Sequence, residues 1–74
     1  GPIDAFINGL CEELNIQIKV SDYHQSAISS GSDAQAAAYI ELEIDGKNSW
    51  GVGINQNTTR ASFEAIIVGL SKIL

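Results

Sequence analysis

Apolar residues near the start of the chain recur at spacings of three and four, which is typical of an amphipathic helix. Pro2 suits the first helical position, because the N–H that it lacks would have no partner there. Asn15 is expected to end the helix. The apolar positions are Ile3, Phe6, Ile7, Leu10 and Leu14.

A period of two then replaces the helical period and predicts strands. A short first strand alternates through Ile16, Ile18 and Val20. A longer second strand places apolar residues at every other position from Ala36 to Ile44. Asp45-Gly46 ends this strand with a strong hairpin motif, because both residues tolerate positive φ.

The third strand is expected where Trp50, Val52 and Ile54 continue the period of two, with Gly51 and Gly53 on the opposite face. Two glycines on one face of a strand usually mean that a helix or another backbone approaches closely there.

The last segment predicts a second helix. The residues 55–59, Asn-Gln-Asn-Thr-Thr, supply capping oxygens. The apolar stripe that follows consists of Phe63, Ile66, Ile67, Leu70, Ile73 and Leu74. The expected fold is therefore α+β, in the order α-β-β-β-α, with a three-stranded antiparallel sheet and the helices on its apolar face.

Length and charge limit the classes of function that the chain can have. The chain has 74 residues, of which 45% are hydrophobic, so residues 1–74 are expected to form one domain with a small core. A net charge of −5 argues against nucleic acid and anionic membranes as partners. No apolar run approaches the ~20 residues that span a bilayer. One cysteine, Cys11, cannot form an internal disulfide, and a cytoplasmic location fits best.

The loop after the first predicted strand contains the residue types of a catalytic triad: Asp22, His24, Ser26, Ser29, Ser30 and Asp33. A triad serine needs a sharply turned backbone beside an oxyanion hole, which a Ser/Gly-rich loop does not offer. Turn and capping roles are therefore favoured over a serine hydrolase. Gly51-Val52-Gly53 lacks the third glycine of a nucleotide-binding motif, and Glu41, Glu43 and Asp45 fit a solvated face better than a cation site.

Small residues are concentrated between Ser26 and Ala38. They leave volume that a helix, a partner chain or a ligand must fill, because a small domain does not keep empty space. This observation favours a binding role for the loop over a reactive one.

Three stretches, "GPIDAF", "DYHQSAISSGSDAQAAAYIELEIDGKNSWGVGI" and "TTRASFEAI", cover most of the chain. Together they resemble the C-terminal regulatory domain of the α-isopropylmalate synthases. The resemblance implies a domain of two βββα units, of which this chain would hold the helix of the first unit and the whole second unit. The catalytic barrel, with its divalent metal and its condensing residues, would lie outside the chain. The chain itself would therefore be non-catalytic and without a cofactor.

The resemblance also implies feedback inhibition by leucine, bound within a dimeric regulatory assembly. Carried over by position, the effector-binding residues are Gly1, Ile3, Asp4, Val20, Tyr23, Ala27, Ala34 and Ile54. The helix start would meet the ligand's carboxylate, Asp4 or loop carbonyls its ammonium group, and the apolar residues its side chain. Val20 and Tyr23 would end the first strand, and Ala27 and Ala34 would lie on the loop.

Two alternatives remain open. The chain could be a purely structural dimerisation module, whose loop packs against a partner. It could also belong to the related citramalate synthases, whose similar domain responds to isoleucine. The two ligands differ only in the placement of a methyl group, a difference worth ~1–3 kcal/mol in an apolar pocket.

Overall fold

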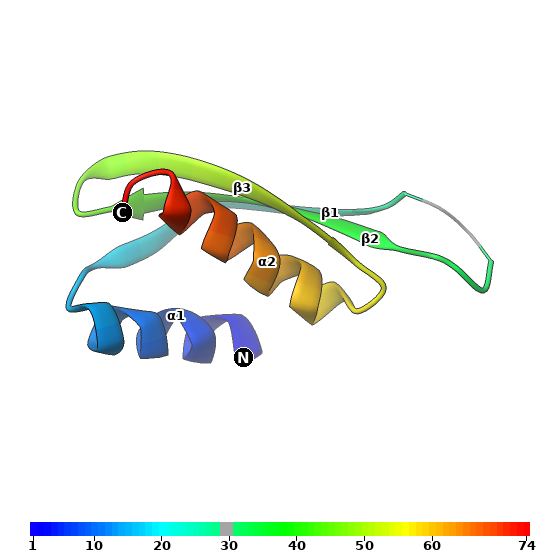
Figure 1. Ribbon diagram of the computed structural model, residues 1–74, viewed down its shortest axis with the longest axis horizontal. Helices are drawn as coiled ribbons and strands as arrows, with labels where there is room; N and C mark the ends of the chain where they lie inside the picture. The colour runs from blue at the N-terminus through cyan, green and yellow to red at the C-terminus, as the bar shows by residue number, and fades with distance from the viewer. Residues whose placement is uncertain (29–30) are drawn as a thin grey trace.

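The computed structural model, which describes residues 1–28 and 31–74, shows two helices and one sheet (Figure 1). In chain order the elements are α1 (Pro2–Leu14), β1 (Ile18–Ala27), β2 (Ala36–Ile44), β3 (Lys47–Asn55) and α2 (Thr58–Ser71). The strands lie side by side in the order β1-β2-β3, and both pairs are antiparallel. The α+β fold and the order α-β-β-β-α are therefore confirmed.

Local chemistry explains where the helices begin and end. Gly1 is the N-cap of α1 and Pro2 is its first residue, while Asn15 ends the helix in the left-handed region at φ 53°. The N-cap of α2 is Asn57, whose side-chain oxygen accepts a hydrogen bond from the backbone N–H of Arg60 at 3.0 Å. This bond satisfies one of the N–H groups that a helix start leaves without a partner.

The turn between β2 and β3 has the predicted conformation. Asp45 and Gly46 both have positive φ, 49° and 83°. The Asp45 side chain also accepts a hydrogen bond from the backbone N–H of Gln17 at 3.2 Å. The turn therefore anchors the segment that enters β1.

Helix α2 packs closely on the sheet because both surfaces carry small residues. A Cβ atom at Gly53 would collide with the Ala61 carbonyl oxygen, and one at Gly51 with the Ala65 carbonyl oxygen. Ala61 and Ala65 are fully buried. The prediction that the glycines admit a close neighbour is confirmed, and the neighbour is the backbone of α2.

This packing reverses the face on which the large side chains of β3 were expected. Gly51 and Gly53 face α2, so Trp50, Val52 and Ile54 point to the outer side of the sheet, where all three are exposed. Close approach of the helix leaves no room for large side chains, and alternation along the strand sends them outward. The apolar side of β3 is thus not the side that the helices cover.

Strand β1 is longer than predicted. It continues to Ala27, which therefore lies on a strand and not on the expected loop, and it pairs with β2 along its whole length. The register shifts between Val20 and Asp22, which indicates a β-bulge. Because of this bulge, Val20 and Tyr23 face the same side although they are three residues apart.

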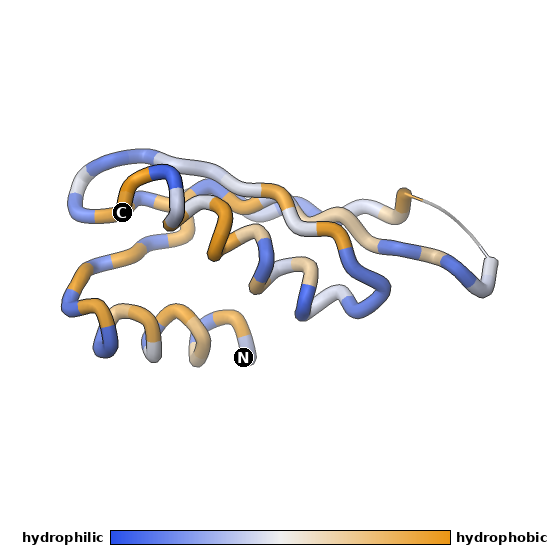
Figure 2. The backbone as a smooth tube through the Cα atoms, in the orientation of Figure 1, coloured by the Kyte–Doolittle hydropathy of each residue, from blue (hydrophilic) through white to orange (hydrophobic). Residues whose placement is uncertain are grey.

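Two further features complete the fold. Helix α1 packs on α2, where the rings of Phe6 and Phe63 stack with centroids 4.3 Å apart. Hydrophobic positions recur along both helices and alternate along β2 (Figure 2). The apolar core consists of Ile7, Ile18, Ala38, Ile40, Leu42, Ile44, Ala61, Ala65, Ile66 and Leu70. No helix in the described part of the chain is long and apolar enough to cross a membrane.

Candidate functional site

The helix-side face of β1 is left uncovered. Helix α2 lies against β2 and β3, and α1 packs on α2, so every β1 residue after Ile18 remains exposed. The register pairs Val20, Tyr23, Gln25 and Ala27 with β2 residues of the helix-side face. We call these four residues the β1 face. The apolar residue Val20 is 39% exposed, and the aromatic residue Tyr23 is 37% exposed.

A polar network links the β1 face to α2. The Tyr23 hydroxyl lies 2.8 Å from the Ser62 hydroxyl, and the Gln25 amide donates to the same Ser62 oxygen at 3.3 Å. Ser62 in turn donates to the Thr58 carbonyl at 3.1 Å, and the Gln25 amide also donates to that carbonyl at 3.2 Å. Ser62 is fully buried. The network therefore holds the side chains of Tyr23 and Gln25, two of the four residues of the β1 face.

Sequence reasoning did not identify Gln25 or Ser62 as part of a site. The available indication was the position of Ser62, which lies four and eight residues before Ile66 and Leu70. A serine on the buried stripe of a helix needs a hydrogen-bond partner. The sequence does not show that this partner lies on a strand almost forty residues away.

The start of α1 holds three of the residues that the resemblance implied. Gly1 accepts the first helical hydrogen bond from Ala5 at 3.1 Å. The N–H groups of Ile3 and Asp4, at the start of the helix, have no intrahelical acceptor and carry the positive end of the helix dipole. The Asp4 side chain is 84% exposed. This helix start thus offers N–H donors and one carboxylate.

The eight implied residues do not surround one cavity within the described chain. Val20 and Ala27 lie seven positions apart on β1, which corresponds to about 20 Å along a strand. Ala34 lies beyond Ala27, in the turn before β2, where its N–H donates to Gly31. Ile54 pairs with Ala37 and points to the other side of the sheet. Only Val20, Tyr23 and Ala27 share a face.

The outer face of the sheet carries a row of rings that crosses all three strands. The His24 and Tyr39 ring centroids are 6.1 Å apart, and those of Tyr39 and Trp50 are 5.5 Å apart. The Lys72 ammonium lies 3.7 Å from the Trp50 ring centroid and donates to the Trp50 carbonyl at 2.6 Å. Lys72 thus covers part of Trp50, which is still 47% exposed.

The arrangement of the triad residues does not support a hydrolase. The His24 imidazole pairs with Asp22 at 3.1 Å, and both side chains are exposed. No hydrogen bond in the described ranges 1–28 and 31–74 joins His24 to Ser26. Ser29 and Ser30 lie outside the described residues.

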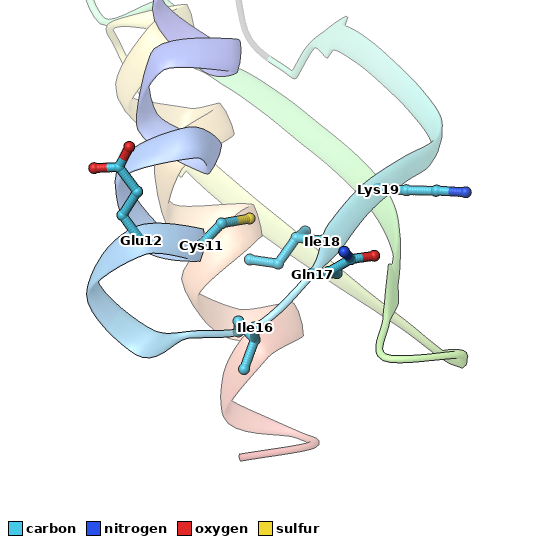
Figure 3. A pocket seen from close by; sticks show the side chains of 6 residues that line it. All are labelled: Cys11, Glu12, Ile16, Gln17, Ile18 and Lys19. Atoms are coloured by element: carbon cyan, nitrogen blue, oxygen red, sulfur yellow. The ribbon is translucent and has the colours of Figure 1, made fainter.

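A shallow, open hollow lies where the end of α1 meets the start of β1 (Figure 3). It is lined by Cys11, Glu12, Ile16, Gln17, Ile18 and Lys19. None of the eight implied residues lines it. In the part of the chain that the structure describes, no group of three or more His, Cys, Asp or Glu residues is placed to hold a metal ion.

The fold is a small α+β module in which α2 packs on β2 and β3 of a three-stranded sheet and α1 packs on α2. The chain belongs to the LeuA allosteric (dimerisation) domain family, whose model matches residues 1–74.

Similar proteins carry this domain as a small part of a longer chain. The chain is 46% identical over 74 residues to a 2-isopropylmalate synthase of Rhizobium meliloti (strain 1021). It is 44% identical over 72 residues to that of Thermobifida fusca (strain YX) and 45% identical over 74 residues to that of Kineococcus radiotolerans. These matches cover 97–100% of the chain but only 12–13% of each relative. The recognised family is thus confirmed, and a regulatory or dimerisation role follows from it.

Proposed function

We propose that the chain is the leucine-sensing part of a 2-isopropylmalate synthase, where it mediates feedback inhibition in leucine biosynthesis and takes part in dimerisation. The observation that carries this proposal is the uncovered β1 face in a chain whose family is described as allosteric. A partly apolar face with fixed polar side chains is suited to a small amphipathic ligand. We assign the synthase reaction and its divalent metal to parts of the proposed enzyme outside this chain.

The available groups match the chemistry of a free amino acid. Backbone N–H donors at the start of α1 favour a carboxylate, and the exposed Asp4 carboxylate favours an ammonium group. Val20 offers an apolar surface for a branched side chain. Burial of such a side chain stabilises a complex by about 2 kcal/mol.

A second unit or copy must complete this site. The implied residues spread over about 20 Å of strand, whereas one amino acid is several times shorter. We therefore propose that residues 1–74 comprise one βββα unit preceded by the helix of another, and that leucine binds where units meet. Residues distant within one chain, such as Ile54 and Val20, could then contact different ligand molecules or different copies.

A purely structural dimerisation module is the second candidate. It is favoured by the exposed outer face of β3, where Trp50, Val52 and Ile54 form an apolar strip. Such strips often mark contacts between chains. A regulatory domain that responds to isoleucine is the third candidate, because the exposed Val20 side chain does not discriminate between the two branched ligands.

A thermal-shift series on the full-length protein that carries this chain separates these candidates. A ligand that binds only the folded state raises the melting temperature as its concentration increases. We expect leucine to give a larger shift than isoleucine or valine at equal concentration. A larger shift with isoleucine would favour the citramalate alternative, and no shift with any of the three would favour the structural module.

A further inference from the structure

The hydroxyl of Ser62 lies within hydrogen-bond distance of three groups, the Thr58 carbonyl, the Gln25 amide and the Tyr23 hydroxyl. A serine hydroxyl offers one donor and two acceptor positions. The Thr58 carbonyl can only accept, and we assign the Ser62 hydrogen to it, over 3.1 Å, because the Tyr23 hydroxyl can itself donate. Both acceptor positions of Ser62 then receive donors, namely the Gln25 amide at 3.3 Å and the Tyr23 hydroxyl at 2.8 Å.

This arrangement commits the only hydroxyl hydrogen of Tyr23 to Ser62. The Tyr23 oxygen then has only lone pairs to offer to other groups. It can accept a hydrogen bond from an ammonium group, which is purely a donor, but it cannot donate to a carboxylate. Tyr23 is 37% exposed on the β1 face, where we place the ligand.

We infer that Ser62 is a positioning residue of the proposed leucine site. By accepting the hydroxyl hydrogen of Tyr23, Ser62 fixes the direction of that O–H bond, so that the Tyr23 oxygen presents only lone pairs to the ligand's ammonium group. The inference rests on the proposed function and adds to it a residue that does not touch the ligand. It also predicts a chemical preference, because ligands with an amino group should depend on Ser62 and ligands without one should not.

Ser62→Ala is a suitable test because it removes little else. Alanine is smaller than serine, so the buried position is not overpacked, and alanine favours a helix. The Gln25 amide keeps its bond to the Thr58 carbonyl, so β1 stays linked to α2. Ser49→Ala is a matched control, since Ser49 is also buried and donates to a helix carbonyl, that of Gly69, at 2.6 Å. Ser49 lies on β3, at the opposite edge of the sheet from β1.

The experiment is calorimetric titration of the full-length protein with leucine and with 4-methylpentanoate, which lacks the amino group. We expect Ser62→Ala to weaken leucine binding about fivefold to tenfold, the usual net effect of one hydrogen bond. Affinity for 4-methylpentanoate should change less than twofold, as should leucine affinity in Ser49→Ala. Tyr23→Phe should weaken leucine binding as much as Ser62→Ala does, and the double variant should bind no more weakly than either single variant.

Several results would overturn the inference. Unchanged leucine affinity in Ser62→Ala would show that Tyr23 does not need this partner. Additive losses in the double variant would show that Ser62 acts independently of Tyr23, and equal losses for both ligands would indicate a general structural defect. If the unmodified protein binds no leucine at all, the proposed function itself fails, which is a different result from a variant that binds normally.

Discussion

Gly53 determines how closely α2 can approach the sheet. In Gly53→Ala the new methyl group would collide with the Ala61 carbonyl oxygen and lie 2.7 Å from the Ala65 nitrogen. These are backbone atoms, so the helix itself must move away. We expect the free energy of unfolding, measured by urea titration, to fall by about 1–3 kcal/mol.

Gly9→Ala provides the control for this substitution. Gly9 also lies in a regular element, α1, but a Cβ atom there meets nothing within 4 Å. Alanine should therefore raise stability by roughly 0.5–1 kcal/mol through its higher helix propensity. Equal effects at both positions would show that α2 does not press on β3 as described.

Individual residues also show what the sequence can and cannot predict. Pro2, Asn15 and the Asp45-Gly46 turn were predicted correctly because each acts through its own backbone conformation. The glycine pair correctly predicted a close neighbour. The outward direction of Trp50 was not predicted, because it depends on which side of β3 the helix covers. That choice is made by the small residues of α2, far along the chain.

We expect the N-cap of α2 to contribute to the free energy of unfolding. Asn57→Ala removes the bond from its side chain to the Arg60 N–H at 3.0 Å and leaves that donor to water. We expect a loss of about 1 kcal/mol in thermal or urea unfolding. The neighbouring exposed Gln56, changed to alanine, should have no effect beyond about 0.5 kcal/mol. A similar loss in both variants would contradict a specific capping role for Asn57.

Strand β1 illustrates why element boundaries were harder to predict than element types. A period of two identified the strand only as far as Val20, because the bulge before Asp22 interrupts the alternation. Beyond the bulge the strand is polar and exposed, so hydrophobicity gives no indication of it. Pairing with β2 holds this stretch as a strand. The resemblance placed Val20 and Tyr23 in one site, and the bulge provides the geometric reason that they share a face.

The molecule exposes large apolar residues on more than one surface. Exposed large residues occur on both sides of the sheet, including Val20 on the β1 face and Ile54 on the outer face. We expect the 74-residue chain to self-associate, since burial of such surface favours association. Sedimentation equilibrium should give a mass above that of one chain, rising with concentration. A single-chain mass at the highest soluble concentration would contradict this expectation.

The proposed site needs more than one unit, so we expect leucine to act through the assembly. An effector lowers activity only if it binds the inhibited arrangement more tightly, usually by ~1–3 kcal/mol. The order of the helices and strands could be predicted from this sequence alone, whereas the covered face of β3 and the end of β1 could not. The assembly of the proposed site could not be predicted either, because the implied residues lie on separate parts of one chain and do not surround one cavity.

The turnover of the full-length enzyme across a leucine titration, with and without Ala34→Leu, tests the central claim most directly. Ala34 is exposed in the turn before β2, so a larger side chain there does not disturb the core. We predict that leucine inhibits the unmodified enzyme, and that Ala34→Leu removes this inhibition while turnover without leucine stays the same. An unmodified enzyme that leucine does not inhibit, or a variant inhibited at the same leucine concentration, would contradict the account.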